Sequence, residues 1–220
     1  MFNKPYENSI SQVAKHLNES IIKNGYGQIP NFLPDESIRK VIEFIEGIKK
    51  ELGLENFGLK EDKLRGTCID DLLQSSIKDL MYETLKCSGI ESDKSRYFVR
   101  LRANLSENFS ESPYQFHFDQ SFLTVAIPII VPSKNEGGAL LMVPNIRNKT
   151  NNKYFESLQR KIYESKLSQK YFSKPTKHKK IFYEKNNAFF FNGKNSLHAT
   201  GPIYKDAKRI VVLLHSWDKI

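Results

Sequence analysis

The spacing of apolar residues changes from helical to alternating near residue 96, and this change restricts the class of fold more than any other feature of the sequence. Before it, apolar residues recur every three or four positions in three segments, as expected of amphipathic helices: 8–23, 34–53 and 70–87. After it, apolar and polar residues alternate as in a strand with one buried face; the apolar positions are Tyr97, Val99, Leu101, Ala103 and Leu105.

Shorter strand-like runs occupy most of the remaining chain. They span residues 114–119, 122–131, 138–143, 180–184, 187–192 and 208–217. A short strand over 26–33 and a polar loop over 54–69 are expected among the helices. Helices first and many short strands afterwards predict an α+β chain whose C-terminal part is a sandwich or barrel.

The net charge of +9 is concentrated in one segment. Residues 147–180 contain eleven Lys and Arg against two acidic residues, Glu156 and Glu164, so the rest of the chain is close to neutral. A uniformly basic nucleic-acid-binding protein is therefore excluded. We interpret 146–180 as a basic insertion between core strands, helical around 152–172, in a position where inserts often cover an active site.

Length and composition fit a single domain over residues 1–220, since 39% hydrophobic residues suffice for a core. The N-terminus lacks a secretory pattern, and the longest apolar run, 123–132, is too short to cross a bilayer. Cys68 and Cys87 form no ligand pair and are expected to be reduced thiols. We therefore expect a cytoplasmic protein with no membrane partner.

The segment Tyr114–Gln120 contains two possible metal ligands. Side chains two positions apart on a strand point to the same side, so His117 and Asp119 can chelate one ion. Such a tripeptide is by itself weak evidence. His198, at the start of a later strand, supplies a third ligand, and two imidazoles with one carboxylate leave coordination positions open, which suits iron(II) and oxygen chemistry.

Arg209 stands eleven positions after His198, at the head of the apolar strand Ile210–Leu214. An arginine beginning a buried strand is costly unless it meets an anion, and its two-pronged guanidinium matches a carboxylate. The alternative is an arginine at a strand end paired with Asp206 or Asp218.

Three spaced motifs together carry a resemblance to a known family. They are His117-Phe-Asp119, the GGALLMVPN segment of 137–145, and His198-Ala-Thr-Gly-Pro followed by Arg209. With the opening GYGQIPNFLPDESI of 25–38, they resemble the phytanoyl-CoA dioxygenase-like branch of the iron(II)/2-oxoglutarate-dependent oxygenases. The resemblance implies a double-stranded β-helix (a jelly-roll, cupin-like core) from strands in 96–145 and 180–217, with N-terminal helices of residues 1–90 packed on one sheet.

The resemblance also implies roles for individual residues. His117, Asp119 and His198 would hold Fe(II), and Arg209 would bind the distal carboxylate of 2-oxoglutarate, with Thr200 hydrogen-bonding it. Arg102 and Asn104, on the polar face of their strand, are further candidates for the co-substrate; a solvent-facing polar edge is the alternative. The expected reaction is hydroxylation with O2, because Asp119 is retained where halogenating members have a small residue.

The substrate is left open by the sequence. Clustered lysines with interleaved aromatic residues in 146–180 are compatible with an anionic small molecule, and equally with a solvated helix. A cupin-like metal-binding or ligand-binding module without oxygenase activity is one alternative, and an oxygenase acting on a protein or nucleic acid is another. His215 stands where nucleic-acid demethylases carry a second arginine, which argues against a nucleic-acid substrate. A monomer or homodimer is expected.

Overall fold

The computed structural model describes residues 9–54, 56–72, 76–105, 114–147, 152–204 and 207–218. Its N-terminal helices are α1 (Ile10–Asn24), α2 (Asp35–Leu52), α3 (Glu61–Leu64), α4 (Cys68–Leu72) and α5 (Ser76–Cys87). Two further helices, α6 (Lys153–Tyr163) and α7 (Lys166–Phe172), and a 3-10 turn over Pro175–Lys177 lie between strands of the core. Among these residues, no helix is long and apolar enough to cross a membrane.

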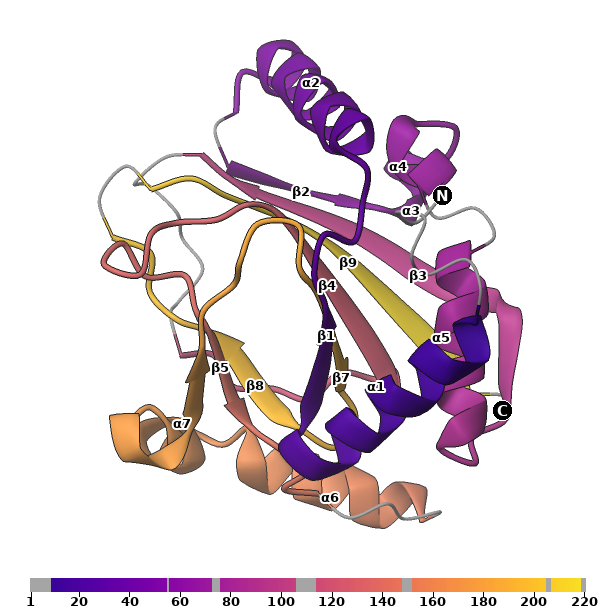
Figure 1. The fold of residues 1–220 in the computed structure, drawn as a ribbon. Coiled ribbons are helices and arrows are strands. Elements are labelled where there is room, and N and C mark those ends of the chain that lie inside the picture. Colours follow the sequence, from indigo (N-terminus) through magenta and orange to yellow (C-terminus); the bar gives the residue numbers. More distant parts are fainter. Residues whose placement is uncertain are drawn as a thin grey trace.

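The strands form two sheets (Figure 1). The large sheet has the order β1-β7-β4-β9-β3-β2, and all its neighbouring pairs are antiparallel. Its strands are β1 (Tyr26–Ile29), β2 (Asn56–Lys60), β3 (Ser92–Asn104), β4 (Leu123–Ile130), β7 (Ala188–Asn192) and β9 (Arg209–Asp218). The small sheet has the order β6-β5-β8, formed by Lys179–Ile181, Leu140–Val143 and Leu197–Thr200.

Each face of the large sheet packs against a different layer. One face joins the apolar sides of α1, α2 and α5 in the largest core cluster, which includes Val99, Leu101 and Val212. The opposite face packs against the small sheet, in a cluster that includes Met142, Phe189 and Val211. Two facing antiparallel sheets with helices on the outside of one of them are the double-stranded β-helix expected from the sequence.

Helices α1 and α2 begin and end close to where the sequence indicates. Gly25 and Gly53 follow α1 and α2 in left-handed conformations, with φ of 90° and 63°, and each donates its N–H to a carbonyl of the last turn. Glycine adopts this conformation without steric cost, so it ends a helix readily. In Figure 1, α1 and α5 lie side by side against the sheet, and α2 covers its other end.

Several sequence expectations differ from the structure. The prediction of a polar loop over 54–69 was wrong, because this segment contains β2, α3 and the beginning of α4. β2 pairs with β3 in register from Asn56↔Asn104 to Lys60↔Arg100, so cross-strand pairing forms a strand that alternating hydrophobicity alone did not indicate. The helix expected over 70–87 is described as two helices, α4 and α5.

Candidate active site

The segment that carries His117 and Asp119 is extended but is not a regular strand. An isolated bridge joins His117 to His198, with mutual backbone hydrogen bonds of 2.9 and 3.0 Å. The N–H of Asp119 donates to the carbonyl of Gly193 at 2.9 Å. The expected strand over 114–119 is therefore reduced to a bridge, but the alternation that places both side chains on one side is preserved.

The structure brings the three candidate metal ligands together. Ligand atoms of His117, Asp119 and His198 all lie within 4.8 Å of one another. Nε2 of His198 lies 3.5 Å from Oδ2 of Asp119, and Nε2 of His117 lies 3.9 Å from Oδ1. Residues 81 positions apart in the chain thus present two nitrogens and a carboxylate to one point, a donor set suited to a divalent transition metal.

Both imidazole rings are oriented by a hydrogen bond to a backbone carbonyl two residues earlier. Nδ1 of His117 lies 2.9 Å from the carbonyl oxygen of Gln115, and Nδ1 of His198 lies 2.9 Å from that of Ser196. A carbonyl oxygen can only accept, so each ring carries its proton on Nδ1 and offers the lone pair of Nε2. Burial lowers the pKa of His198 to about 4, so this ring is neutral near pH 7 and ready to bind a metal.

Asp119 is held in a polar pocket of its own. The hydroxyl of Thr124 donates to Oδ2 at 2.5 Å, and Nδ1 of His215 lies 3.7 Å from the same oxygen. Burial opposes ionisation, but His198, His215 and the Thr124 hydrogen bond outweigh it and hold the pKa of Asp119 below its usual value. Asp119 therefore presents an ionised carboxylate.

Gly193 leaves the space that this carboxylate occupies. A Cβ added at Gly193 would overlap both Oδ2 of Asp119 and the hydroxyl oxygen of Thr124. Glycine is required at this position because Asp119 and Thr124 lie close to its backbone, and any side chain would displace one of them.

The second candidate region lies on the inner faces of β3 and β9. Asn104 and Arg209 are direct cross-strand partners, and both are buried, with 2% and 4% of their surface exposed. Both polar atoms of the Asn104 amide are buried without a hydrogen-bond partner among the described residues. Arg102 shares this inner face with Asn104, because the residues in between pack on the helix side.

Tyr183 was missed by the sequence reasoning and belongs to the same region. Its ring centroid lies 5.5 Å from the guanidinium carbon of Arg209. Burial raises the pKa of the Tyr183 hydroxyl, so it stays protonated, although Arg209 and Arg102 act in the opposite direction. Thr200, two residues after His198 on β8, shares the inner face of the small sheet.

These residues fit a small dicarboxylate such as 2-oxoglutarate. The Asn104 amide, whose polar atoms have no partner among the described residues, is unfavourable when buried, and a carboxylate bound beside Asn104 and Arg209 would supply a partner. Leu197 and Ala199 of β8 pack in the outer cluster, so His198 and Thr200 point to the inside of the roll, as Arg209 does from β9.

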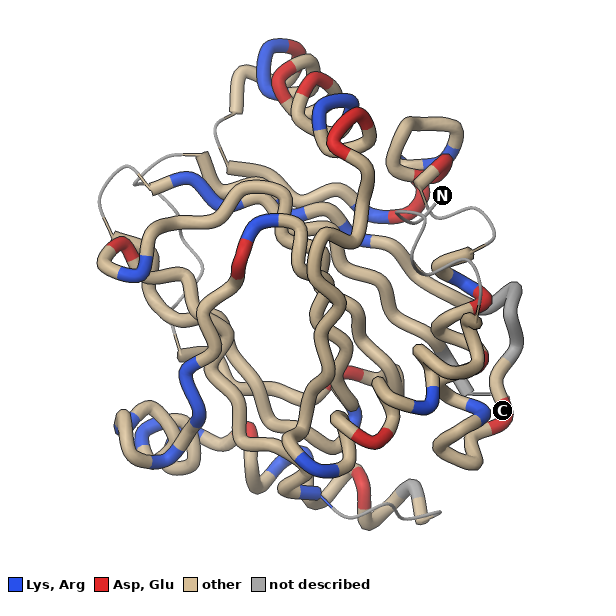
Figure 2. Tube along the Cα trace, in the orientation of Figure 1, with Lys and Arg blue, Asp and Glu red and all other residues tan. Residues whose placement is uncertain are grey.

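The basic insertion packs on the outer side of the metal-ligand segment. The N–H of Phe118 donates to Oε1 of Glu164 at 3.0 Å, and Arg160 donates to the carbonyl of Phe118. Phe116 and Phe118 join Phe172 of α7 in a separate apolar cluster with the outer face of the small sheet. In Figure 2, α7 carries Lys positions and no acidic one, so the charge of this helix lies on the outer side of the roll.

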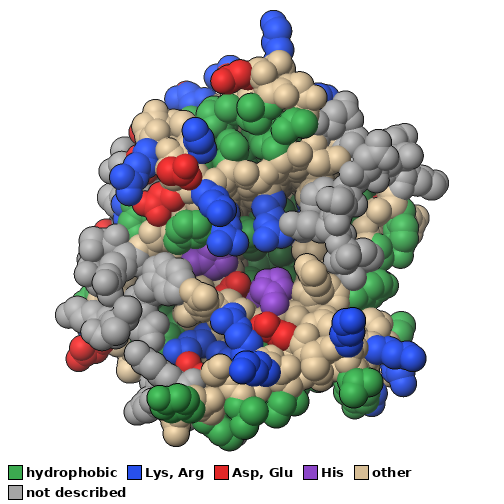
Figure 3. All heavy atoms as spheres, turned by 180° about the vertical axis from the view of Figure 1, so that it is seen from behind, with side chains coloured by type: hydrophobic (Ala, Val, Ile, Leu, Met, Phe, Trp, Pro, Cys, Tyr) green, Lys and Arg blue, Asp and Glu red, His purple; other side chains and the backbone are tan. Residues whose placement is uncertain are grey.

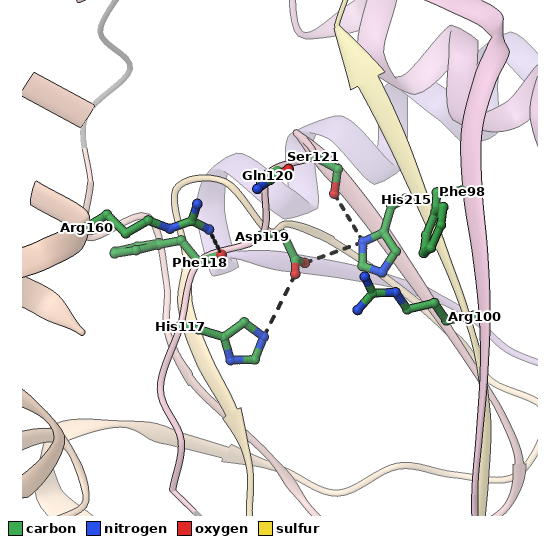
Figure 4. A pocket seen from close by; sticks show the side chains of 9 residues that line it. All are labelled: Phe98, Arg100, His117, Phe118, Asp119, Gln120, Ser121, Arg160 and His215. Carbon is green, nitrogen blue, oxygen red and sulfur yellow. Dashed lines mark hydrogen bonds and ion pairs between the residues drawn. The ribbon is translucent and has the colours of Figure 1, made fainter. Parts of the chain in front are cut away.

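A cavity of about 230 Å³ opens beside the metal ligands. It is lined by Phe98, Arg100, His117, Phe118, Asp119, Gln120, Ser121, Arg160 and His215. Figure 3 shows histidine side chains with an acidic side chain between them in this hollow, and basic side chains on both sides. In Figure 4, Arg100 and His215 point toward Asp119 from one wall, and Arg160 lies on the other.

His215 and Arg100 were given no role from the sequence, although alternation could have indicated both. His215 is six positions after Arg209 on β9, and Arg100 is four before Asn104 on β3, so each shares the inner face. Nδ1 of His215 lies 3.1 Å from the Ser121 hydroxyl and 3.2 Å from that of Thr124. These contacts make His215 part of the wall that supports Asp119.

Solved structures that share this fold include prolyl hydroxylases and a non-heme alpha ketoglutarate dependent carbocyclase. A prolyl 4-hydroxylase from Phytophthora capsici has a TM-score of 0.65 at 13% identity, covering 99% of this chain and 67% of its own. A Pseudomonas putida prolyl-4-hydroxylase has a TM-score of 0.62 at 10% identity, covering 94% of this chain and 100% of its own. The non-heme alpha ketoglutarate dependent carbocyclase SnoK, from nogalamycin biosynthesis, has a TM-score of 0.66 at 13% identity, covering 93% and 83%.

Identities this low show a shared fold and no more. No family model matches the sequence, and a search of curated proteins finds no similar one. The chain thus has the double-stranded β-helix fold of 2-oxoglutarate-dependent oxygenases, and its described residues include a His-Asp-His set that could hold a metal.

Proposed function

We propose that this protein is a non-haem iron(II) and 2-oxoglutarate-dependent dioxygenase that hydroxylates an unactivated C–H bond of a small molecule. The observation that carries the proposal is the convergence of His117, Asp119 and His198, with both imidazole Nε2 atoms turned toward the carboxylate beside an open cavity. Three protein ligands leave positions for a co-substrate and oxygen, whereas a structural zinc site is closed by four.

The resident groups would be Fe(II) on His117, Asp119 and His198, and 2-oxoglutarate with its distal carboxylate on Arg209. Bound iron with 2-oxoglutarate supplies the oxidising chemistry, in which O2 is consumed and the co-substrate becomes succinate and carbon dioxide. Thr200, Arg102, Asn104 and Tyr183 would orient the co-substrate through hydrogen bonds and charge.

The chain's other contribution is to position the reactants and exclude water. The hydroxyl of Thr124 donates a hydrogen bond to Asp119, and this bond keeps the carboxylate ionised and fixed in place. Val211, Phe189 and Met142 belong to the apolar cluster between the two sheets, which also contains Phe191 beside His198 and Tyr183 beside Arg209. Charged groups interact more strongly in such a dry interior than in water.

Three narrower statements belong to this proposal. Membership of the phytanoyl-CoA dioxygenase-like branch is supported by the motif spacing of His117, Asp119, His198 and Arg209 in the sequence. A cytoplasmic location is supported by Cys68 and Cys87, which are both free thiols. A small substrate is supported by the cavity volume, which is below the 300–1,000 Å³ common for drug-sized ligands.

The test is anaerobic addition of Fe(II) and then 2-oxoglutarate, with detection of the weak visible charge-transfer band and, in air, of succinate. His198→Ala should abolish the band and the iron-dependent succinate, while His16→Ala, at an exposed histidine of α1, should change neither. A band of wild-type intensity in His198→Ala would refute the metal assignment. Tight metal binding with no response to 2-oxoglutarate would favour a non-oxygenase metal-binding module.

A further inference from the structure

Arg100 is the feature of the cavity that the proposed function leaves unexplained. It lies on the inner face of β3, opposite Leu213 of β9, and lines the cavity beside the candidate metal ligands. Its guanidinium carbon is 4.8 Å from the ring centroid of Phe98, so the aromatic ring supports it from one side. In Figure 4 the guanidinium extends from β3 toward His215 and Asp119.

The charge of Arg100 is not met by a protein carboxylate among the described residues. Its Nε is buried and has no hydrogen-bond partner within the part of the chain that the structure describes. Arg160, the other arginine of the cavity, is already engaged, since it pairs with Glu164 at 3.1 Å and donates to the carbonyl of Phe118. Among the described residues that line the cavity, Asp119 is the one acidic residue, and it belongs to the candidate metal set.

The anion that meets Arg100 is not expected to be the distal carboxylate of 2-oxoglutarate. That group is assigned to the region of Arg209 and Asn104, which are paired across β9 and β3. Arg100 is four residues from Asn104, about 13 Å along the strand at ~3.3 Å per residue. Arg100 borders the open cavity, whereas Asn104 and Arg209 are not among its lining residues.

We propose that Arg100 binds an anionic group, a carboxylate or a phosphate, on the molecule that is oxidised. This inference rests on the proposed function, because it takes the cavity beside the metal ligands as the site of that molecule. A guanidinium forms paired, charge-assisted hydrogen bonds with either anion, and stacking on Phe98 fixes its plane in advance. Anchoring at Arg100 would hold a small substrate in the cavity beside His117 and Asp119.

The experiment uses the full chain with Zn(II) in place of iron and with N-oxalylglycine, an oxygen-inert analogue of 2-oxoglutarate. Binding of three probes is measured by saturation-transfer NMR: propionate, methyl phosphate, and propionamide as the neutral match of propionate. We expect at least one anion to bind about tenfold more tightly than propionamide. Whichever anion binds more tightly identifies the chemical class, carboxylate or phosphate.

Two variants test whether Arg100 itself holds the anion. Arg100→Gln should remove the preference for the anion, while Arg39→Gln, at an exposed arginine of α2 paired with Glu43, should retain it. Equal binding of propionate by wild type and Arg100→Gln would overturn the inference, since the anion would then be held by the metal or another cation. Equal binding of both anions and propionamide would also overturn it. Failure to take up Zn(II) and N-oxalylglycine would instead refute the proposed function.

Discussion

The side-chain amide of Gln169 pairs with the backbone of Phe116 in both directions. Nε2 donates to the Phe116 carbonyl at 2.6 Å, and Oε1 accepts from its N–H at 2.7 Å. Phe116 immediately precedes His117, so a residue of the helical insertion holds the chain next to a candidate metal ligand. The amide thus bonds the outer edge of this segment as a neighbouring strand would.

Removing this pairing should weaken metal binding. Gln169→Leu keeps the approximate size of the side chain but loses both hydrogen bonds, so the segment around His117 is less well fixed. We expect the dissociation constant for Fe(II) to rise about tenfold, as is typical when groups supporting a metal ligand are lost. Calorimetric titration under anaerobic conditions measures it, with Gln12→Leu on the exposed face of α1 as the control. An equal loss of thermal stability with and without metal, at unchanged affinity, would contradict a positioning role.

Adding one methyl group at Gly193 should have a larger effect. In Gly193→Ala the new Cβ overlaps Asp119 and Thr124, so the carboxylate must move and metal binding should fall by a factor of about 100. Gly47→Ala is the matched control, because a Cβ added there would have no described atom within 4 Å other than those of its own helix backbone and chain neighbours. That variant should gain about 1 kcal/mol of stability, since glycine within a helix is unfavourable. Wild-type metal affinity in Gly193→Ala would show that Asp119 is not a ligand.

Replacing the buried amide of Asn104 should separate co-substrate binding from stability. Asn104→Leu removes a polar group that has no partner among the described residues, so the metal-free protein should be equally stable or up to about 2 kcal/mol more stable. The KM for 2-oxoglutarate should nevertheless rise about tenfold, measured by succinate release.

Asn18 is the control for Asn104, because its side-chain amide has hydrogen-bond partners. Its amide donates to the carbonyl of Cys87 and accepts from the hydroxyl of Ser88, so Asn18→Leu should cost about 1–3 kcal/mol with no change in KM. A marked loss of stability in Asn104→Leu would mean that the amide is satisfied within the protein.

The metal-free protein should lose stability as the solution becomes mildly acidic. Burial lowers the pKa of His198 to about 4, below the unfolded value of about 6.5. Between these values the unfolded chain binds a proton that the folded protein does not, so stability is complete above pH 6.5 and falls as the pH falls. The free energy of unfolding should drop by about 2 kcal/mol from pH 7 to pH 5 because of His198.

Urea unfolding in the presence of a chelator measures this change. His198→Asn should lose about 2 kcal/mol less over the same interval, while retaining the part due to His215, whose pKa is also lowered, chiefly by burial. A variant with the same pH dependence as wild type would show that another group is responsible.

Much of the site could be predicted because the relevant information is local. Residues two apart on an extended segment share a side, so the spacing of His117 and Asp119 indicates one chelating pair. The same rule places Arg100 on the polar face of its strand with Arg102 and Asn104, and His215 on the face of β9 that carries Arg209, although neither residue was assigned a binding role from the sequence.

Which face of a strand looks inward was decided only by packing. Alternation in β3 separates Leu101 from Arg102, but it does not say whether the polar side meets solvent or a second sheet. In the structure the apolar side packs on the helices and the polar side faces the inside of the roll. A chain that lines a binding site with charged groups thus has the same pattern as one with a solvated surface.

By itself, the sequence of this protein determined the strand periodicity, the candidate ligands His117, Asp119 and His198, and the spacing to Arg209. The tertiary structure alone decided that β2 extends the large sheet, that Tyr183 joins Arg209, and that Gln169 supports the segment before His117. The physical reason is the separation along the chain of the residues that interact. Periodicity and spacing act within a few residues, whereas these pairings join residues tens of positions apart, and they exist only once the two sheets and the insertion have packed together.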